Sequence, residues 1–492
     1  MGKTRMNLSV RAGLVAVCLL SPWLLEAATA GQAKYIFLLI GDGMGASHRA
    51  AAEIYLNGTN RDDSSYRKLA MNSLPVVGLS RTQSTNSWVT DSAAAGTAIA
   101  TGRKTRSGAI SMSADGKTSF PTIAEIAKKR GMKVGIVSNV SIDHATPASF
   151  YAHHRTRSAY NDITMQLVKS NFDYFGGGTN KNYRKSSNSR VDSVVTAARE
   201  RGYTVTTGSS QFGKLKTGAG KVWARTGNAG PAGEMSYAID RDKKALSLAD
   251  FTDRGIDLLE NPKGFFMMVE GGKIDWASHV QDAATVVREI LAFDQAVGKA
   301  LEFYRKHPEE TLVIVTADHE TGGMGLGNDY SGSSTRLEAL TGQKVSGEAF
   351  YNKTVQKLRR EKPSFSDTLA EVEKAFGLQD LGDSEKAELQ DAYEATMNPG
   401  KRSAERRAKY GRYDPLTITC TRLVSRRAGI GWTSHSHTAV PVPTTAIGPG
   451  SKALGGFHDN TDIFHAVLQA LPKPESAAPE TNPATRTTRK AG

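Results

Sequence analysis

The chain has 492 residues, of which 39% are hydrophobic and 23% are charged. This composition and a mean hydropathy of -0.39 exclude fibrous, disordered and multispanning membrane proteins, and they allow one large domain or about three ordinary ones. The formal net charge of +14 favours anionic partners, which include nucleic acid, an acidic membrane surface and small phosphorylated or sulfated molecules.

The N-terminal segment has the pattern of a secretory signal peptide. Basic residues precede an apolar run over residues 12–25, and Ala28-Thr29-Ala30 is typical of a cleavage site. The apolar run is too short to span a bilayer comfortably. We therefore expect a signal peptide over residues 1–30, a mature chain without a membrane span, and a periplasmic or secreted protein. Cys18 and Cys420 alone cannot build a disulfide framework.

Strand-like apolar runs alternate with helical patterns through most of the remaining chain. The predicted strands are residues 35–40, 76–80, 133–137, 265–269 and 312–316, and the clearest helical patterns are residues 122–130, 191–201 and 280–304. Such alternation predicts an α/β fold with a mostly parallel central sheet flanked by helices on both faces. In folds of this kind, ligands bind beyond the carboxyl ends of the strands.

Two later segments differ from this pattern. From about residue 326 to 428, Lys, Arg and Glu become dense and strand signals almost disappear, which predicts a helical insertion in a domain of residues 31–472. The tail, residues 473–492, is rich in Pro, Ala, Thr and Glu and has no periodic apolar residues, so we expect it to be disordered.

Residues 401–412 form a basic stretch inside the predicted insertion. Nucleic-acid binding is one interpretation, but the stretch lacks interleaved aromatic residues and a recognisable reading motif. A solvated helix face is the favoured interpretation, and we expect no specific nucleic-acid reader.

The first predicted strand runs directly into Gly41-Asp42-Gly43-Met44-Gly45. Glycine lets the backbone turn sharply and lets a bulky group approach, and a carboxylate at a strand end can bind a cation. A plain tight turn with Asp42 as the turn former remains the alternative.

Asp91 and Ser92 precede an alanine-rich run that is typical of a helix. A hydroxyl at a helix start lies where backbone N–H groups and the helix dipole favour an anion, such as a phosphoryl or sulfuryl group. An ordinary N-cap is the alternative. The nearby Gly102-Arg103-Lys104-Thr105 resembles the end of a phosphate loop, but Thr97 stands where that loop needs a glycine.

Another apolar strand leads into Glu270, Asp275 and His279. Asp275 and His279 are four residues apart, so on a helix they share a face and can bind one ion. Glu270, at the strand end, could serve a separate ion. An uncompensated carboxylate beside so apolar a strand would be costly, which disfavours a role as an ordinary surface polar group.

Asp318 and His319 follow a further apolar strand, and His435 and His437 lie far along the chain. Each group alone could be a turn or a core histidine. Three strand ends that all carry Asp, Glu or His jointly predict a polynuclear zinc or magnesium site.

The motifs IGDGMG, TDSAAAGTA, HATPASFYAHHRTR, VEGGKIDWASH, VTADHETGG and HSHTAVPVP occur in the order found in the alkaline phosphatases. The sequence resembles a bacterial member of that family, over residues of about 34–325 and 430–466. The resemblance implies an alkaline-phosphatase-like fold, hydrolysis of small phosphate monoesters through a phosphoserine, and a homodimer.

The resemblance also implies three metal sites. The nucleophile would be Ser92. The first zinc would be held by Asp275, His279 and His437. The second zinc would be held by Asp42, Asp318 and His319, with Ser92 completing the site. The third metal, usually magnesium, would be held by Asp42, Thr146 and Glu270.

Arg157 matches the family's phosphate-gripping arginine, with Arg155 as its neighbouring rival and Asp91 as the residue that would orient it. The planar guanidinium can bind two phosphate oxygens at once. His144 and Trp276, which stand where the best-known bacterial pattern has Asp and Lys, would border the substrate. We expect these replacements to alter magnesium affinity and to weaken phosphate retention.

Two other functions compete with this prediction. A phosphodiesterase or sulfatase of the same superfamily would share the two-metal frame, but Arg157, Thr146, Glu270 and the context of Ser92 favour monoesters. A noncatalytic phosphate or metal scavenger would not need the serine nucleophile.

Overall fold

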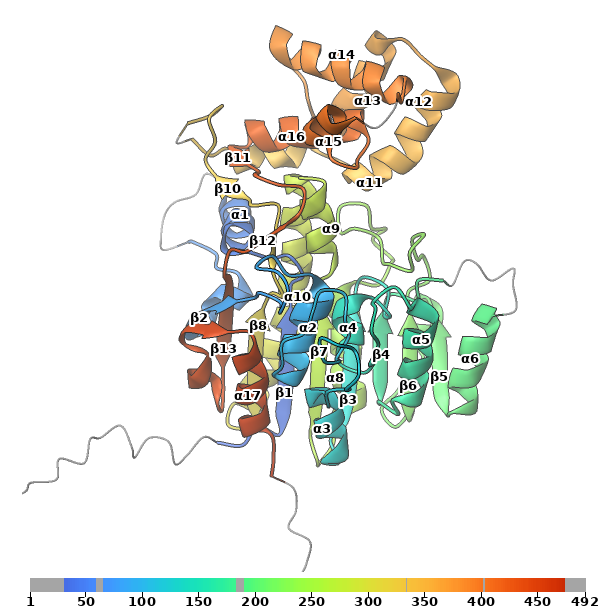
Figure 1. The fold of residues 1–492 in the computed structure, drawn as a ribbon, viewed down its shortest axis with the longest axis vertical. Helices are drawn as coiled ribbons and strands as arrows, with labels where there is room; N and C mark the ends of the chain where they lie inside the picture. The colour runs from blue at the N-terminus through green and yellow to red at the C-terminus, as the bar shows by residue number, and fades with distance from the viewer. Residues whose placement is uncertain (1–30, 59–64, 183–189, 333, 401–402, 474–492) are drawn as a thin grey trace, which may run out of the picture.

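A computed structural model describes residues 31–58, 65–182, 190–332, 334–400 and 403–473. The predicted signal peptide and residues 474–492 of the predicted tail lie outside this part of the chain. Figure 1 shows a sheet domain with a helical segment above it. None of the helices in the described part is long and apolar enough to cross a membrane.

The described residues form one ten-stranded sheet, which is parallel except that β13 runs antiparallel to both of its neighbours. This confirms the predicted mostly parallel sheet. In sheet order the strands are β14 (Gly456–Asp459), β2 (Val76–Arg81), β13 (Val442–Ile447), β8 (Thr311–Thr316), β1 (Tyr35–Ile40), β7 (Phe265–Glu270), β3 (Lys133–Ser138), β4 (Tyr174–Gly177), β6 (Lys221–Arg225) and β5 (Tyr203–Thr207).

Helices cover both faces of the sheet, because alternate residues of its buried strands point to opposite sides. Phe37 and Leu39 of β1 belong to one apolar core, and Ile36 and Leu38 belong to the other. The first core is covered by α1 (Ala46–Asn57), α8 (Leu248–Leu259) and α10 (Ala283–Lys306). The second is covered by α2 (Ser92–Thr101), α3 (Ile123–Lys129), α5 (Tyr160–Lys169), α6 (Arg190–Glu200) and α17 (Thr461–Ala470).

Residues 337–427 form the helical segment, which Figure 1 shows in orange above the sheet. Its elements are η5 (Leu337–Gly342), α11 (Gly347–Ala349), η6 (Phe350–Val355), α12 (Gln356–Glu361), α13 (Phe365–Phe376), α14 (Asp383–Met397), α15 (Ala404–Tyr410) and α16 (Pro415–Arg427). Phe350, Leu389 and Leu416 are buried in the same core as α10, so the segment packs on the sheet domain through continuous apolar contacts.

Short elements complete the described structure. They are the helices η3 (Ala70–Ser73), α4 (Ala145–Ala148), α7 (Ser209–Phe212), α9 (Lys273–His279) and η7 (Ser451–Leu454), and the strands β9 (Glu320–Thr321), β10 (Gly325–Leu326), β11 (Ile430–Gly431) and β12 (His437–Thr438). The pairing of β12 with β9 places His437 directly opposite Thr321. This two-stranded ribbon therefore brings the distant histidine motif to the end of β8.

Candidate active site

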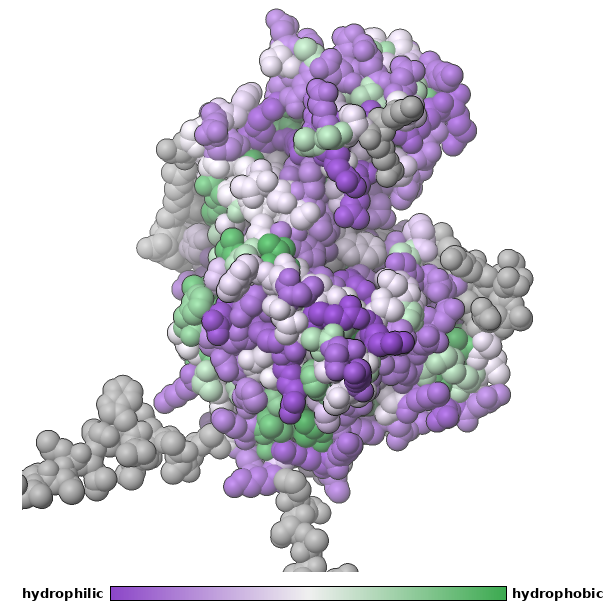
Figure 2. All heavy atoms as spheres, viewed as in Figure 1, coloured by the Kyte–Doolittle hydropathy of each residue, from purple (hydrophilic) through white to green (hydrophobic). Residues whose placement is uncertain are grey.

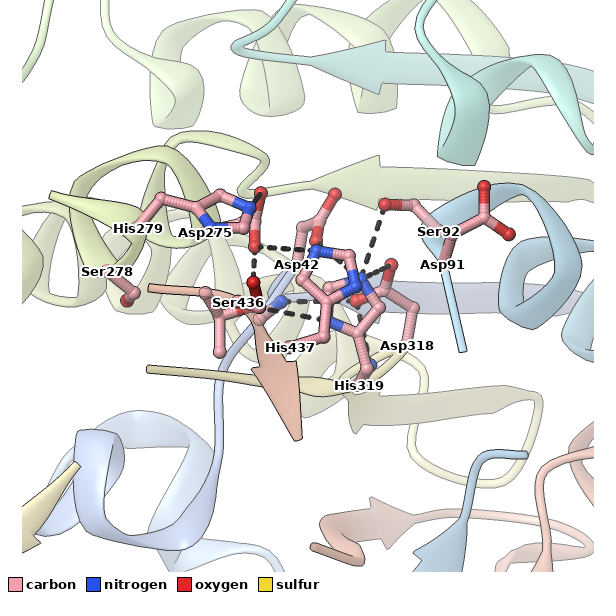
Figure 3. A network of polar contacts seen from close by, with 12 residues as sticks. Asp42, Asp91, Ser92, Asp275, Ser278, His279, Asp318, His319, Ser436 and His437 are labelled. Carbon is pink, nitrogen blue, oxygen red and sulfur yellow. Dashed lines mark hydrogen bonds and ion pairs between the residues drawn. The ribbon is translucent and has the colours of Figure 1, made fainter. Parts of the chain in front are cut away.

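Three acidic side chains meet where neighbouring strands end. Asp42 and Asp318 follow β1 and β8, and Glu270 is the last residue of β7. Because β8, β1 and β7 are adjacent and parallel, their carboxyl ends lie at one edge of the sheet. All three side chains are fully buried. Figure 3 shows Asp42, Asp275, Asp318, His319 and His437 pointing toward one another.

Asp275 lies at the centre of the first ligand group. It forms a group with His319 and His437 in which the ligand atoms lie within 4.8 Å of one another. His279 is one helical turn away on α9, and its Nε2 lies 3.3 Å from Asp275 Oδ2. His437 Nε2 lies 3.5 Å from Asp275 Oδ1. The structure thus gathers the three residues that the sequence assigns to the first zinc, with His319 also within reach.

Asp42, Asp318 and His319 form the second ligand group, again within 4.8 Å. Ser92 Oγ lies 3.3 Å from His319 Nε2, on the side of the group that faces α2. Every residue that the sequence assigns to the second zinc is therefore in one place.

Asp42 also belongs to a third group, with His144 and Glu270. Thr146, the third ligand implied by the sequence, donates a long hydrogen bond of 3.4 Å to Asp42 Oδ2. Ser138 donates a short hydrogen bond to the second oxygen of Glu270. His144, expected to border the substrate and to alter magnesium affinity, thus lies among the ligand atoms of this group.

The carboxylates of these groups lack the partners that buried anions need. Within the described residues, Asp42 Oδ1, Glu270 Oε1 and Asp318 Oδ2 are buried without a hydrogen bond. Burial, and then the charges of neighbouring carboxylates, raises the pKa of each of the three acids. Divalent cations would bind the unpaired oxygens and neutralise the buried negative charges, so the donor set fits bound metal ions.

The histidine ligands have defined orientations, and burial favours the neutral form of His319. Burial, followed by repulsion from His437, lowers the pKa of His319 well below its usual value. His437 Nδ1 donates to the Thr90 carbonyl at 2.8 Å, and His279 Nδ1 donates to the His435 carbonyl at 2.6 Å. Both contacts leave Nε2 free to bind an ion, which is the usual arrangement of metal-bound imidazoles.

Ser92 is the first residue of α2, where backbone N–H groups favour an anion. Asp91 is the N-cap and accepts a hydrogen bond from Ala94 N at 3.1 Å. The other Asp91 oxygen lies 3.0 Å from Arg157 Nη1. One carboxylate therefore fixes both the helix that carries the serine and the arginine beside it.

Arg157, not Arg155, points into the site. Its Nη2 donates to His144 Nε2 at 3.1 Å, whereas the exposed Arg155 side chain lies against Gly116. Trp276 packs edge-on to His144, with ring centroids 5.8 Å apart. The residues that the sequence assigns to the substrate are therefore neighbours of the third ligand group.

Several supporting residues carry no clear signal in the sequence. Thr321 donates from Oγ1 to Asp275 Oδ1 at 2.5 Å and lies 3.3 Å from His319 Nδ1. Ser138 donates a hydrogen bond to Glu270. The backbone carbonyls of Thr90 and His435 accept hydrogen bonds from His437 and His279. Thr321 and Ser138 stand at strand ends, which is the one feature that could have indicated them.

The fold and these side chains define a metal-binding hydrolase of the α/β class. The family model for alkaline phosphatase matches residues 33–472. Alkaline phosphatase 4 of Bacillus subtilis is 32% identical over 450 residues, which cover 89% of each chain. The chain therefore belongs to the alkaline phosphatase family and acts as a phosphatase on phosphate monoesters.

Solved structures agree with this assignment. The cold-active alkaline phosphatase of a psychrophilic Shewanella species matches with a TM-score of 0.75 at 30% identity, covering 89% of this chain and all of that one. An alkaline phosphatase from the Antarctic bacterium TAB5, in a variant with histidine replaced by aspartate and Mg bound in its M3 site, matches with a TM-score of 0.62 at 26% identity. That match covers 89% of this chain and 98% of the other.

Proposed function

We propose that this enzyme hydrolyses phosphate monoesters through a phosphoserine on Ser92, served by two zinc ions and one magnesium ion. The observation that carries the proposal is the position of Ser92 Oγ, which lies at the N-terminus of α2 and 3.3 Å from His319 Nε2. A nucleophile there faces both the helix dipole and the second ligand group.

The ligand groups support this metal content. Nitrogen and carboxylate donors suit zinc, and oxygen donors suit magnesium. Asp275, His279 and His437 would hold the first zinc. Asp42, Ser92, Asp318 and His319 would hold the second. Asp42, Thr146 and Glu270 would hold magnesium. Bound zinc lowers the pKa of a hydroxyl or water and stabilises charge on oxygen.

The chain's own residues position the two displacements. Ser92 Oγ attacks phosphorus, the bond to the alcohol oxygen breaks, and the alcohol leaves with a proton. Water then attacks the phosphoserine, the bond from phosphorus to Oγ breaks, and Ser92 recovers its proton as phosphate leaves. Arg157 binds the phosphoryl oxygens throughout, and Asp91 holds its guanidinium in place.

His144 makes the third site different from one built only on oxygen donors. While Arg157 donates to its Nε2, the proton of the neutral ring lies on Nδ1, so neither nitrogen can bind an ion. His144 can therefore act as a ligand only when Arg157 turns away, for example toward phosphate.

Stepwise metal restoration tests the metal content. After chelation, we expect zinc to restore most of the hydrolysis of phenyl phosphate and magnesium to add to it only when zinc is present. Activity that survives full chelation, or that magnesium restores alone, would contradict the two-zinc assignment.

Ser92→Ala tests the nucleophile, with the exposed Ser209→Ala on α7 as its matched control. We expect Ser92→Ala to lose the phosphoserine that can be trapped at low pH and to lose turnover by several orders of magnitude. Ser209→Ala should retain both. A trapped phosphoserine in Ser92→Ala would assign the nucleophile to another residue.

Ester preference tests the substrate class. Phenyl phosphate should be cleaved far faster than bis(4-nitrophenyl) phosphate or phenyl sulfate, because Arg157 and the metal groups together suit a dianion. A strong preference for the diester or the sulfate would favour a phosphodiesterase or sulfatase.

We also propose that the protein is exported and acts as a homodimer. The signal-peptide pattern of residues 1–30 supports export to the periplasm or the medium. The exposed apolar side chains Val77, Leu79 and Phe457 on β2 and β14, at one end of the sheet, support association with a second copy. Mass analysis of the exported chain and light scattering test these two statements.

A further inference from the structure

A cavity of about 990 Å³ lies between α9 and the helical segment. Trp276 and His279 line it from the sheet domain, and Arg406, Arg407, Arg412 and Tyr413 line it from the helical segment. Figure 2 shows a notch between the helical segment and the sheet domain, with hydrophilic residues over most of the segment's visible surface. The cavity therefore has one wall from each part of the molecule.

The cavity borders the catalytic centre at His279. His279 lines it and also contacts Asp275, at 3.3 Å. On the opposite wall, the ring of Tyr413 packs against His435 with centroids 5.5 Å apart. The His435 carbonyl accepts the hydrogen bond from His279 Nδ1 at 2.6 Å. The loop that carries Arg412 and Tyr413 is thus held beside the first ligand group by direct contacts.

Two of the arginines on this wall, Arg407 and Arg412, have neither an ion pair nor a side-chain hydrogen bond within the described residues. Arg359 also lines the cavity, but it is paired with the buried Asp414 at 2.9 Å. Arg406 donates to the Ala395 carbonyl at 2.9 Å. Arg407 and Arg412 are exposed and form no ion pair with any residue in the described part of the chain. Their positive charges are available to a molecule in the cavity.

The remaining groups of the cavity favour an organic, ring-bearing guest with negative charge. Trp276, Tyr237 and Tyr351 provide aromatic surface. Glu348 is the other acidic residue of the lining besides Asp414, and burial raises its pKa, which disfavours its charged form. Flat aromatic surface and free guanidinium groups suit an apolar body with an anionic end.

We propose that this cavity receives the alcohol part of the phosphate monoester, and that Arg407 and Arg412 favour substrates whose alcohol carries a further negative charge, such as a carboxylate or a second phosphate. This inference rests on the proposed function, because it places the leaving alcohol next to His279. It assigns a role to the basic stretch of residues 401–412 that phosphate recognition itself does not use.

Two substrates that differ only in charge test the inference. Phenyl phosphate has a neutral leaving group, and 4-carboxyphenyl phosphate adds one carboxylate. The preference ratio is kcat/KM for the carboxylated substrate divided by kcat/KM for phenyl phosphate. Comparing this ratio between variants cancels the difference in intrinsic reactivity of the two leaving groups.

We expect Arg412→Gln and Arg407→Gln each to lower the preference ratio by about 3- to 5-fold, the effect of one partly solvated charge pair. Arg412→Lys should retain most of the ratio because it keeps the charge. Arg305→Gln is the matched control, since Arg305 is exposed in the last turn of α10, at the opposite end from the site. Its ratio should equal that of the wild type.

Added salt should lower the wild-type ratio more than the ratio of a double variant that carries Arg407→Gln and Arg412→Gln, because exposed charges are screened. An unchanged ratio in both arginine variants, or a ratio that Arg305→Gln lowers equally, would overturn the inference while leaving the proposed function intact. A wild-type enzyme that cleaves neither substrate would overturn both.

Discussion

Replacing Arg157 with lysine should lower kcat/KM for phenyl phosphate by one to two orders of magnitude. Arg157 uses Nη1 for Asp91, at 3.0 Å, and Nη2 for His144, at 3.1 Å. Anchored by Asp91, the guanidinium can present a fixed pair of N–H groups to phosphate. A single ammonium group cannot reproduce both this anchoring and a bidentate contact.

The magnitude follows from the hydrogen bond that is lost. A hydrogen bond to a charged group contributes about 1.5–3 kcal/mol. At about 1.4 kcal/mol per factor of ten, the expected loss of kcat/KM is about 10- to 150-fold. The Arg157 and Asp91 side chains are 24% and 22% exposed, so the ion pair itself should contribute only about 1 kcal/mol or less to stability.

Arg155→Lys is the matched control, because Arg155 is two residues away and lies against Gly116 instead of the site. Steady-state kinetics and the inhibition constant of inorganic phosphate should be measured for both variants. We expect weaker phosphate inhibition in Arg157→Lys and wild-type values in Arg155→Lys. A large loss in Arg155→Lys with little change in Arg157→Lys would refute the assignment.

Three further predictions concern other residues around the site. His144→Asp should increase the dependence of activity on magnesium, because an aspartate supplies oxygen ligands and needs no release by Arg157; an unchanged magnesium titration would contradict this. Trp276→Lys should strengthen inhibition by phosphate, since it adds a cation near His144, whereas Trp276→Phe should not; equal inhibition constants would argue against weaker phosphate retention in the wild type. Burial lowers the pKa of His48 to about 4, so its neutral form stabilises the fold above pH 6.5 and this contribution is lost as the pH falls toward 4. Between pH 7 and pH 5, denaturant titrations should show the wild type losing about 2 kcal/mol more unfolding free energy than His48→Gln, and parallel losses would contradict the shift.

The sequence predicts the apolar central strands β8, β1, β7 and β3, and also β2 near one end of the sheet. The strands that it misses have weaker local patterns. β4 contains Gly176 and Gly177, and Gly177 has a φ of 110° with Ser138 O only 1.9 Å from where a Cβ would lie. Close approach of β3 requires glycine there, although glycine lowers strand propensity. β13 contains Pro443 and polar threonines, which local periodicity does not mark as a buried strand.

Thr444 of β13 shows why this strand could not be predicted from the sequence alone. Thr444 Oγ1 lies 2.8 Å from both Ser80 Oγ and Thr316 Oγ1, on the two neighbouring strands. A hydroxyl can be buried here only because its partners come from strands distant in the sequence. The residues alone do not reveal that pairing.

Asp42, Glu270, Asp318 and His319 were predictable as candidate ligands because they lie at strand ends, a local feature. The contact of His144 with Arg157 was not, because it depends on side-chain orientation. The basic stretch is a similar case. Ala404–Tyr410 forms a largely exposed helix, in line with a solvated face, yet Arg406 and Arg407 also line the cavity beside the site. Sequence spacing cannot show what lies opposite a helix.

The sharing of Asp42 has a thermodynamic consequence. This carboxylate belongs to two ligand groups, with Oδ1 near His319 and Oδ2 near Thr146. An ion bound by one group changes the charge and the position that Asp42 offers to the other. Linkage requires the effect to be reciprocal. Metal uptake by the second and third groups is therefore a coupled equilibrium, in which occupancy of each depends on the free concentration of both ions.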